Sequence, residues 1–517
     1  MDDHRADTGK IATQQQEEIA ESNENPYRDI PSPEGARTAE IAQGEQGNGK
    51  RRRRRPFHRE SYSHTHFKVY KRRWFGLAQL VLLNIVVSWD WLTFAPVSSR
   101  AADYFDVSET AINWLSTGFM FAFVLVSPLT MWTLHSGGPK TSIIWSSGFL
   151  LLGNWIRYIG TRVNGGMYPV VLVGQILTGF AQPFVLAAPT RYSDLWFTES
   201  GRISATALAS LANPFGGALA QLITPLLPSI PTTVLLPTIL STACTLPTLF
   251  LPAAPPTPPS YSSTLPKPPL LSPSTRSLLT SPPFYILFLT FSCYVGLFNS
   301  YSSLLNQILY PYGYSEDEAG ISGAILIVVG LVCAAILSPI FDRTHKFLLG
   351  IKLLCPLVGA SYLGLVWAPQ TRTLEAPYVL SGVLGAASFS LLPLALEYMV
   401  EVTWPVSPEV GSTVCWAGGQ LFGGVFIVVM NALKDGNGVD VKRVSEMGRG
   451  RGGGSRPEGN MYRALVFQAV VALVVLPLPL CLGVERLGLG QKEGRLRMDE
   501  TGEAVGGTGD AAREQGS

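Results

Sequence analysis

The sequence predicts an all-α, polytopic membrane protein with twelve transmembrane helices in two six-helix bundles. Apolar runs recur along the 517 residues, and each has about the twenty residues needed to cross a bilayer. Only 15% of the residues are charged, and the mean hydropathy is +0.23, which is unusual for a soluble domain. A segment rich in proline and serine, residues 253–283, separates the runs into two equal sets because proline cannot continue a helix.

A polar tail, residues 1–69, precedes the first apolar run and has no apolar period, so we expect it to be disordered. Arg51–Arg55 are five consecutive arginines within it. Such a cluster either keeps this end of the chain in the cytoplasm or contacts anionic lipid, and we favour the first interpretation. With so many membrane spans, we expect no nucleic-acid partner.

Six runs predict the first bundle, within residues 70–252, and six predict the second, within residues 284–484. The runs cover residues 74–97, 112–134, 141–160, 168–190, 203–227, 231–252, 284–308, 320–341, 347–367, 375–399, 410–431 and 461–484. We expect a cytoplasmic linker at 253–283, a flexible loop at 432–460 and a disordered tail at 485–517.

The charges of the loops predict that both termini are cytoplasmic. Basic residues gather in the loops that this topology places inside, and acidic residues follow the first and seventh runs outside. The basic set includes Lys140, Arg191, Arg202, Arg343 and Lys346, and the acidic set includes Asp103, Asp106, Glu109, Glu316, Asp317 and Glu318. The basic, Gly-rich segment 434–463 disagrees with this rule. The pattern fits a plasma membrane and an internal membrane equally.

Motifs of enzymes and of metal sites are missing from the sequence. All six cysteines lie in apolar runs without CxxC spacing, which argues against disulfides and against a metal site. We find no Gly-rich phosphate loop with lysine, no HExxH and no nucleophile elbow. We therefore expect no enzyme, no cofactor and no metal, and a transporter would be facilitated or coupled to a gradient.

The first apolar run, WFGLAQLVLLNIVVSWDWLTFAP, contains an acid in its interior, Asp90. A charged residue in a spanning helix is costly, and it usually faces a cavity or a partner group. On a helix, Asp90, Trp91 and Phe94 fall on one face. A carboxylate beside aromatic rings would hold an organic cation by charge and by cation–π attraction. An arginine of a neighbouring helix paired with Asp90 would exclude that role.

Polar residues in four later runs are further candidates. Gln182 in the fourth run, Asn299 and Tyr301 in the seventh and Gln420 in the eleventh either bind substrate or form hydrogen bonds between helices. Glu397 and Glu401, one turn apart in the tenth run, either carry protons or gate the site, or they pair with basic loop residues. We favour the pairing for these two glutamates.

Several stretches resemble the feline leukaemia virus subgroup C receptor-related transporters of the major facilitator superfamily. They include YKRRWFGLAQLVLLNIVVSWDWLTFAPVSS, INWLSTGFMFAFVLVSP and VGQILTGFAQPFVLAAPTRYSDLWF in the first half. SSLLNQILYPYGYSEDEAGISG and LPLALEYMVEVTWP lie in the second half. The resemblance runs in order from about Tyr70 to Leu433, and it implies two bundles that rock about a site near the midplane.

This resemblance also implies a substrate class. Animal members of the family are known as carriers of choline and ethanolamine, with an older proposal of haem export, and an aromatic cage holds the ammonium group. The cage tryptophan falls on Trp91, and family glutamines fall on Gln182 and Gln420. Two positions depart from the family: a cage tyrosine is replaced by Asn299, and the glutamine before the cage tryptophan by Asp90.

From these residues we predict a monomeric membrane transporter that moves a small organic solute, a choline- or ethanolamine-like cation, by alternating access. Asp90 would supply charge, Trp91 and Phe94 would face the cation, and the glutamines would bond to its hydroxyl or amine. One alternative is an exporter of haem or another amphipathic metabolite. An alternative of another class is a membrane receptor or sensor that does not transport.

Overall fold

The computed structural model describes residues 68–257, 281–344, 346–403, 408–436 and 456–484. The predictions for Arg51–Arg55, for nearly all of the N-terminal tail, for most of the linker and of the Gly-rich loop, and for the C-terminal tail fall outside these residues. All regular structure in the described residues is helical.

The described residues supply the twelve predicted spans. Ten helices are long and apolar enough to cross a bilayer. One of them contains α5 (Glu109–Arg162), whose 54 residues are broken at Gly138, where φ is 71° and ψ is −177°, so α5 provides two spans. α8 (Glu199–Ile223), with 25 residues, is also long enough and provides the twelfth.

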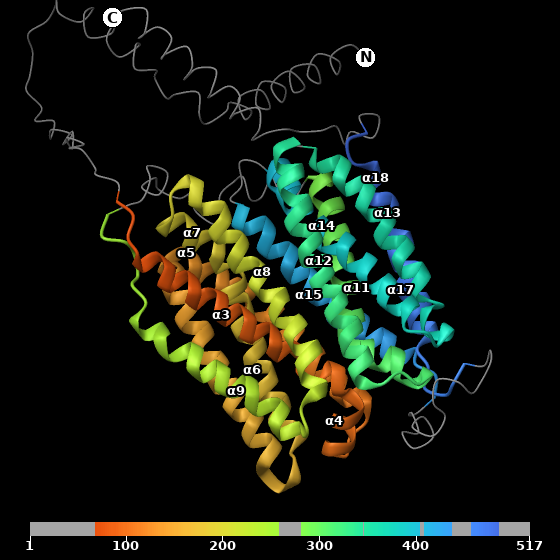
Figure 1. The fold of residues 1–517 in the computed structure, drawn as a ribbon. Helices are drawn as coiled ribbons and strands as arrows, with labels where there is room; N and C mark the ends of the chain where they lie inside the picture. The colour runs from red at the N-terminus through yellow and green to blue at the C-terminus, as the bar shows by residue number, and fades with distance from the viewer. Residues whose placement is uncertain (1–67, 258–280, 345, 404–407, 437–455, 485–517) are drawn as a thin grey trace, which may run out of the picture. The chain divides into compact units, whose positions relative to one another are not determined.

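Residues before the linker form the first bundle (Figure 1). α3 packs against α6 and α8, and α5 packs against α6 and α9. Its other helices are α3 (Arg72–Leu92), α4 (Ser98–Phe105), α6 (Tyr168–Leu186), α7 (Ala188–Trp196) and α9 (Ile230–Thr245), with the short 3₁₀ helices η1 (Ala95–Val97) and η3 (Thr224–Leu226).

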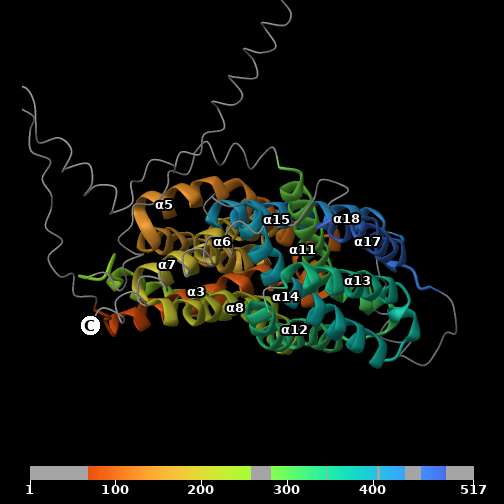
Figure 2. The ribbon, with the colours of Figure 1, turned by 90° about the horizontal axis from the view of Figure 1, so that it is seen from above.

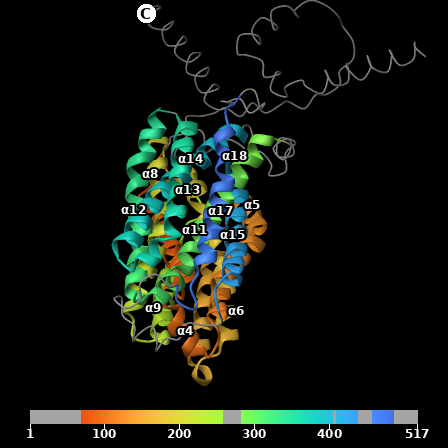
Figure 3. The same cartoon turned by 90° about the vertical axis from the view of Figure 1, so that its right-hand side faces the viewer.

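Residues after the linker form the second bundle, which faces the viewer in Figure 3. α12 packs against α14, and α11 packs against α15. The helices are α11 (Pro282–Leu309), α12 (Glu316–Thr344), α13 (Phe347–Leu365), α14 (Glu375–Thr403), α15 (Pro408–Ala432), α17 (Tyr462–Val475) and α18 (Pro477–Cys481).

The largest contacts between the two bundles involve three pairs of elements. α15 lies beside α5, α12 lies beside α8, and η1 lies against α11. Seen from above, the red-to-yellow first bundle and the green-to-blue second bundle adjoin along this line (Figure 2). Residues far apart in the sequence therefore face each other where a transporter of this plan would hold its substrate.

Large apolar side chains cover the outside of both bundles. Leu125 is 73% exposed and Val474 is 69% exposed, which would be costly in water but suits contact with lipid tails. Inside, small residues let helices approach closely. A Cβ atom on Gly153 of α5 would lie 2.7 Å from the carbonyl oxygen of Gly174 on α6.

Candidate functional site

Trp91 lies where the two bundles meet. It is the penultimate residue of α3, its side chain is half-buried, and it packs against two clusters of buried residues, one in the first bundle and one made of second-bundle residues together with Met120 of α5. Its indole Nε1 is buried and has no hydrogen-bond partner among the described residues. The indole ring therefore has packing contacts but no hydrogen bond, and its N–H is left without a partner in the described structure.

Gln182 lies on α6, which runs beside the part of α3 that contains Trp91. Hydrogen bonds join α6 to α3 on either side of Gln182. Gln175 Nε2 donates to the Asp90 carbonyl oxygen over 2.9 Å, and Asn84 Nδ2 donates to the Val185 carbonyl oxygen over 3.1 Å. The Gln182 side chain is 3% exposed, and its Oε1 has no hydrogen-bond partner in the described structure. The first bundle thus presents an unpartnered acceptor as well as an unpartnered donor.

Asn299 of α11 and Gln420 of α15 form the matching pair in the second bundle. Asn299 Nδ2 donates to Gln420 Oε1 over 3.4 Å. A Cβ atom on Gly423 would lie 3.0 Å from Met120 Sδ and 3.1 Å from Asn299 Cβ. This amide pair therefore lies close to α5 of the first bundle.

Asp90 is paired with an arginine, so the predicted role of its charge is wrong. Arg157 Nη1 of α5 lies 2.6 Å from Asp90 Oδ1, and both side chains are 0% exposed. Asn154 Nδ2 donates to Asp90 Oδ2 over 2.6 Å. A buried carboxylate is strongly favoured to find such partners, and the neutral pair has no net charge to offer a cation.

Phe94 also faces Arg157, which corrects the prediction that it faces a substrate cation. The Arg157 guanidinium carbon lies 5.5 Å from the centre of the Phe94 ring, and the ring is 2% exposed. Thr93 and Phe94 keep right-handed helical backbone angles, so Asp90 and Phe94 share the predicted face, and the group that both of them contact is Arg157.

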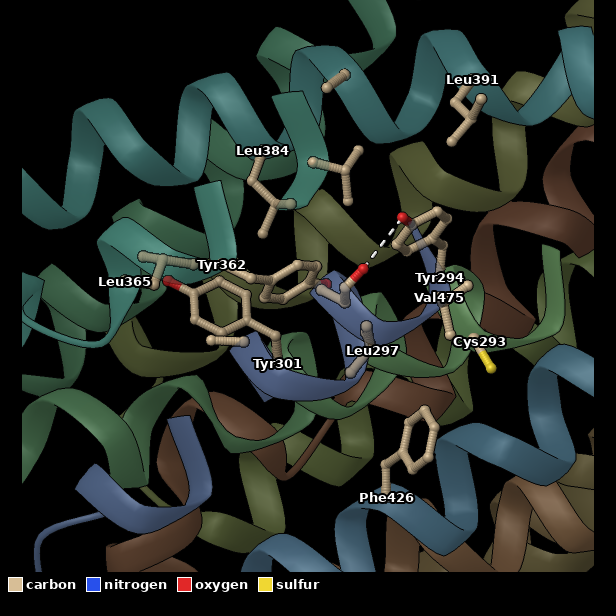
Figure 4. Close-up of a cluster of buried hydrophobic side chains, with 14 of the residues drawn as sticks. Cys293, Tyr294, Leu297, Tyr301, Tyr362, Leu365, Leu384, Leu391, Phe426 and Val475 are labelled. Atoms are coloured by element: carbon tan, nitrogen blue, oxygen red, sulfur yellow. Dashed lines mark hydrogen bonds between the residues drawn. The ribbon is translucent and has the colours of Figure 1, made fainter. Parts of the chain in front are cut away.

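Tyr301 belongs to the core of the second bundle, and its role as a substrate-binding residue stays a prediction. It is 1% exposed, and its hydroxyl shares a hydrogen bond of 3.0 Å with Ser381 Oγ. Figure 4 shows its ring beside Tyr362 and Leu365. On a helix, Asn299 and Tyr301 point about 200° apart, so one of them faces the first bundle and the other faces α14.

Glu397 and Glu401 both lie on α14. Glu397 is half-buried, and the side chain of Glu401 lies outside the described side chains. Their role as proton carriers or gating residues stays a prediction. Among the described side chains, no group of three His, Cys, Asp or Glu could hold a metal ion.

Arg157 is the residue that sequence reasoning missed at this site. It is the one basic residue in the predicted third span, residues 141–160. An intramembrane arginine requires a partner, so Asp90 and Arg157 could have been matched as the acid and the base of two predicted spans. Their separation of 67 residues along the chain hides the contact from any local pattern.

Ion pairs join the bundles at the end opposite the start of α3, here called the outer end. Arg100 Nε of α4 lies 2.5 Å from Glu316 Oε2 of α12. Arg100 also donates to the carbonyl oxygens of Leu227 at 3.0 Å and Pro225 at 3.1 Å. Lys434 forms an ion pair with Glu109 of α5. Both ion pairs link the first bundle to the second.

Hydrogen bonds between amide side chains also join the two bundles at the outer end. Asn113 Nδ2 donates to Gln307 Oε1 over 3.1 Å, and Gln307 Nε2 donates back to Asn113 Oδ1 over 2.7 Å. Asn306 Nδ2 donates to the Pro96 carbonyl oxygen over 2.7 Å. A pocket of about 300 Å³ adjoins these contacts between α5 and α15. Because Trp91, Gln182, Asn299 and Gln420 do not line this pocket, we do not assign the substrate to it.

Removing Asp90 is expected to destabilise the protein. Asp90→Ala leaves the Arg157 guanidinium buried without its counter-ion, which costs about 3–5 kcal/mol. We expect a clearly lower midpoint of thermal unfolding in detergent for Asp90→Ala than for Asp103→Ala, which removes an exposed acid. Asp90→Leu/Arg157→Leu should recover most of the loss, because an apolar pair of similar volume replaces a buried ion pair at little cost. Equal midpoints for Asp90→Ala and Asp103→Ala would contradict this expectation.

Known proteins resemble this chain in sequence and in fold. The sequence model of the Major Facilitator Superfamily matches residues 80–427. Solute carrier family 49 member A3 of Danio rerio is 36% identical over 377 residues, which cover 71% of this chain and 80% of the relative. The choline/ethanolamine transporter FLVCR1 of Felis catus is 30% identical over 391 residues, which cover 70% of this chain and 68% of the relative.

Two solved structures share the fold. A bacterial homologue of the human lysosomal transporter Spinster, inward-facing and unoccupied, aligns with a TM-score of 0.60 at 16% identity and covers 80% of this chain and 97% of its own. The transporter FucP in an outward conformation aligns with a TM-score of 0.53 at 14% identity and covers 79% and 99%. At these identities the likeness concerns the helical architecture.

Proposed function

Because the chain belongs to the feline leukaemia virus subgroup C receptor-related family of the major facilitator superfamily, we propose that it carries a choline- or ethanolamine-like organic cation. It is a multi-pass membrane transporter and not an enzyme. The observation that carries the proposal is the position of Trp91 between the two bundles. The FLVCR1 relatives are named as choline/ethanolamine transporters, which favours this substrate class.

Binding would depend on the aromatic ring, since the Asp90–Arg157 pair is neutral. A desolvated ammonium over an indole face gains about 2 kcal/mol. The Trp91 Nε1 donor and the Gln182 Oε1 acceptor have no partners in the described structure. A hydroxyl group of a small solute would satisfy both, because it can accept from the indole N–H and donate to the amide oxygen, and buried polar groups gain from such bonds.

The opposing amide pair would complete the site from the second bundle. Asn299 and Gln420 bond to each other through Asn299 Nδ2 and Gln420 Oε1, so Asn299 Oδ1 and Gln420 Nε2 could bind a polar substrate group. Neutral amides suit a hydroxyl or an amine better than a second charge. Asn299, Gln420, Trp91 and Gln182 are the substrate-binding residues that we propose.

Transport would proceed by alternating access. The described structure is joined at its outer end by Arg100–Glu316, Lys434–Glu109 and the Asn113–Gln307 bonds. These contacts would separate when the substrate site opens to that side, while the bundles rock about the site. We propose that the protein acts as a monomer with both termini in the cytoplasm, in the plasma membrane or an internal membrane.

Uptake into vesicles tests the proposed substrate. Purified protein in lipid vesicles should accumulate labelled choline or ethanolamine saturably, and protein-free vesicles should not. Binding of either compound without flux would favour the non-transporting receptor or sensor. Flux of haem without flux of choline or ethanolamine would favour the exporter of amphipathic metabolites.

A further inference from the structure

We propose that Arg157 is a positioning residue that holds Trp91 in place for the substrate, an inference that rests on the proposed function of Trp91. Arg157 does so through Asp90, which immediately precedes Trp91, and Phe94, which lies three residues after it.

The backbone around Trp91 lacks the regular support of a continuous helix. α3 ends one residue later, at Leu92, and the Thr93 N–H reaches the Asp90 carbonyl oxygen over 3.5 Å. The 3₁₀ helix η1 follows with Pro96 in it, and proline has no N–H to continue the ladder. Contacts from other helices must therefore determine the position of this segment.

Three hydrogen bonds hold Asp90 from two other helices. Gln175 of α6 binds its carbonyl oxygen, Arg157 binds Oδ1, and Asn154 binds Oδ2. Arg157 Nη1 also lies 3.3 Å from Asn154 Oδ1, so these side chains form one connected network. The residue immediately before Trp91 is thus held in both its main chain and its side chain.

Arg157 also contacts the residue that follows the helix end. Its guanidinium lies over the ring of Phe94 at 5.5 Å, while its Nη1 binds Asp90. The rigid, planar guanidinium of Arg157 therefore contacts residues that lie before and after Trp91 in the chain. The Trp91 indole has no hydrogen bond of its own in the described structure, so its orientation depends on the backbone that Arg157 braces.

The adjoining helix leaves room for this arginine. A Cβ atom on Gly174 of α6 would lie 2.7 Å from both Arg157 Cγ and Arg157 N. A larger residue at 174 would clash with the Gly153 carbonyl oxygen and with Arg157. Local packing and the ion pair therefore place the guanidinium in one position.

The decisive variant is Asp90→Leu/Arg157→Leu, which removes the brace without leaving a buried charge. The chain contains 11 tryptophans, so the protein would be labelled with 5-fluorotryptophan and the Trp91 resonance assigned with Trp91→Phe. We expect the Trp91 ¹⁹F line to shift or broaden in the double variant and in Arg157→Leu. Arg162→Leu removes an exposed arginine at the end of the same helix, and it should leave the line in place.

Uptake kinetics supply the second measurement. Misplacement of a binding group by about 1 Å can cost about 100-fold, so we expect the KM for choline to rise about 10- to 100-fold in the double variant. A purely structural role would lower the amount of active protein and the maximal rate, and it would leave KM unchanged.

The outcomes separate the two proposals. An unmoved Trp91 line with an unchanged KM in a folded double variant would overturn the positioning role. If the unmodified protein takes up neither choline nor ethanolamine, the proposed substrate fails. The ¹⁹F line still tests the positioning role in that case, because it is recorded without substrate.

Discussion

Replacing Trp91 with alanine is expected to lower choline uptake at low substrate concentration by about 30-fold, the equivalent of about 2 kcal/mol. The loss follows from removal of the ring face, since the Asp90–Arg157 pair offers no compensating charge. Uptake by purified protein in vesicles at several substrate concentrations would separate the effect on KM from that on the maximal rate.

Two variants make the Trp91 result specific. Trp91→Phe keeps an aromatic face and should retain most of the uptake. Trp132→Ala removes a tryptophan of α5 that is 60% exposed on the outside, so its uptake should match that of the unmodified protein. A normal KM in Trp91→Ala would remove this residue from the site.

Locking the outer end is expected to abolish transport completely. Cysteines at positions 100 and 316 replace an ion pair between the bundles, and a short bifunctional methanethiosulfonate reagent would join them. The bundles must part at this end if access alternates, so cross-linked protein should show no uptake. Cleavage of the link by a reducing agent should restore it.

Single-cysteine variants control for the reagent. Each should keep its uptake after treatment, since Cys244, Cys293, Cys355 and Cys415 are buried and the other two native cysteines are only partly accessible. Undiminished uptake by fully cross-linked protein would show that this end does not need to open.

The fold could be predicted from the sequence in considerable detail. Apolar runs of membrane-spanning length are a local property of the chain, because a bilayer requires every backbone polar group to be paired within the helix. The predicted run 168–190 corresponds to α6, which covers Tyr168–Leu186. The predicted run 74–97 lies within the candidate span Arg72–Phe105, which is made of α3, η1 and α4 because the helix is interrupted after Leu92, ahead of Pro96. The sequence likewise predicted the transporter family and that the protein is not an enzyme, and the comparisons confirm both predictions.

The candidate site could be predicted only in part. Trp91, Gln182, Asn299 and Gln420 were identified from polar and aromatic residues in apolar runs, and they remain the proposed site. Asp90 and Phe94 were misjudged for one shared reason, their contacts with Arg157. The Tyr301 hydroxyl has a partner on α14, Ser381, and its role in the site stays a prediction.

Local composition was enough to predict which segments are helical and which residues are costly to place in a membrane. Local composition did not show which contacts offset the cost of placing these residues in a membrane. Whether the Asp90 carboxylate binds a substrate or pairs with an arginine depends on a contact between residues that are 67 positions apart in the sequence. That contact exists because α5 crosses α3 and because Gly174 leaves room for the arginine side chain. Electrostatic neutralisation acts through space and not along the chain, so only the packed helices reveal it.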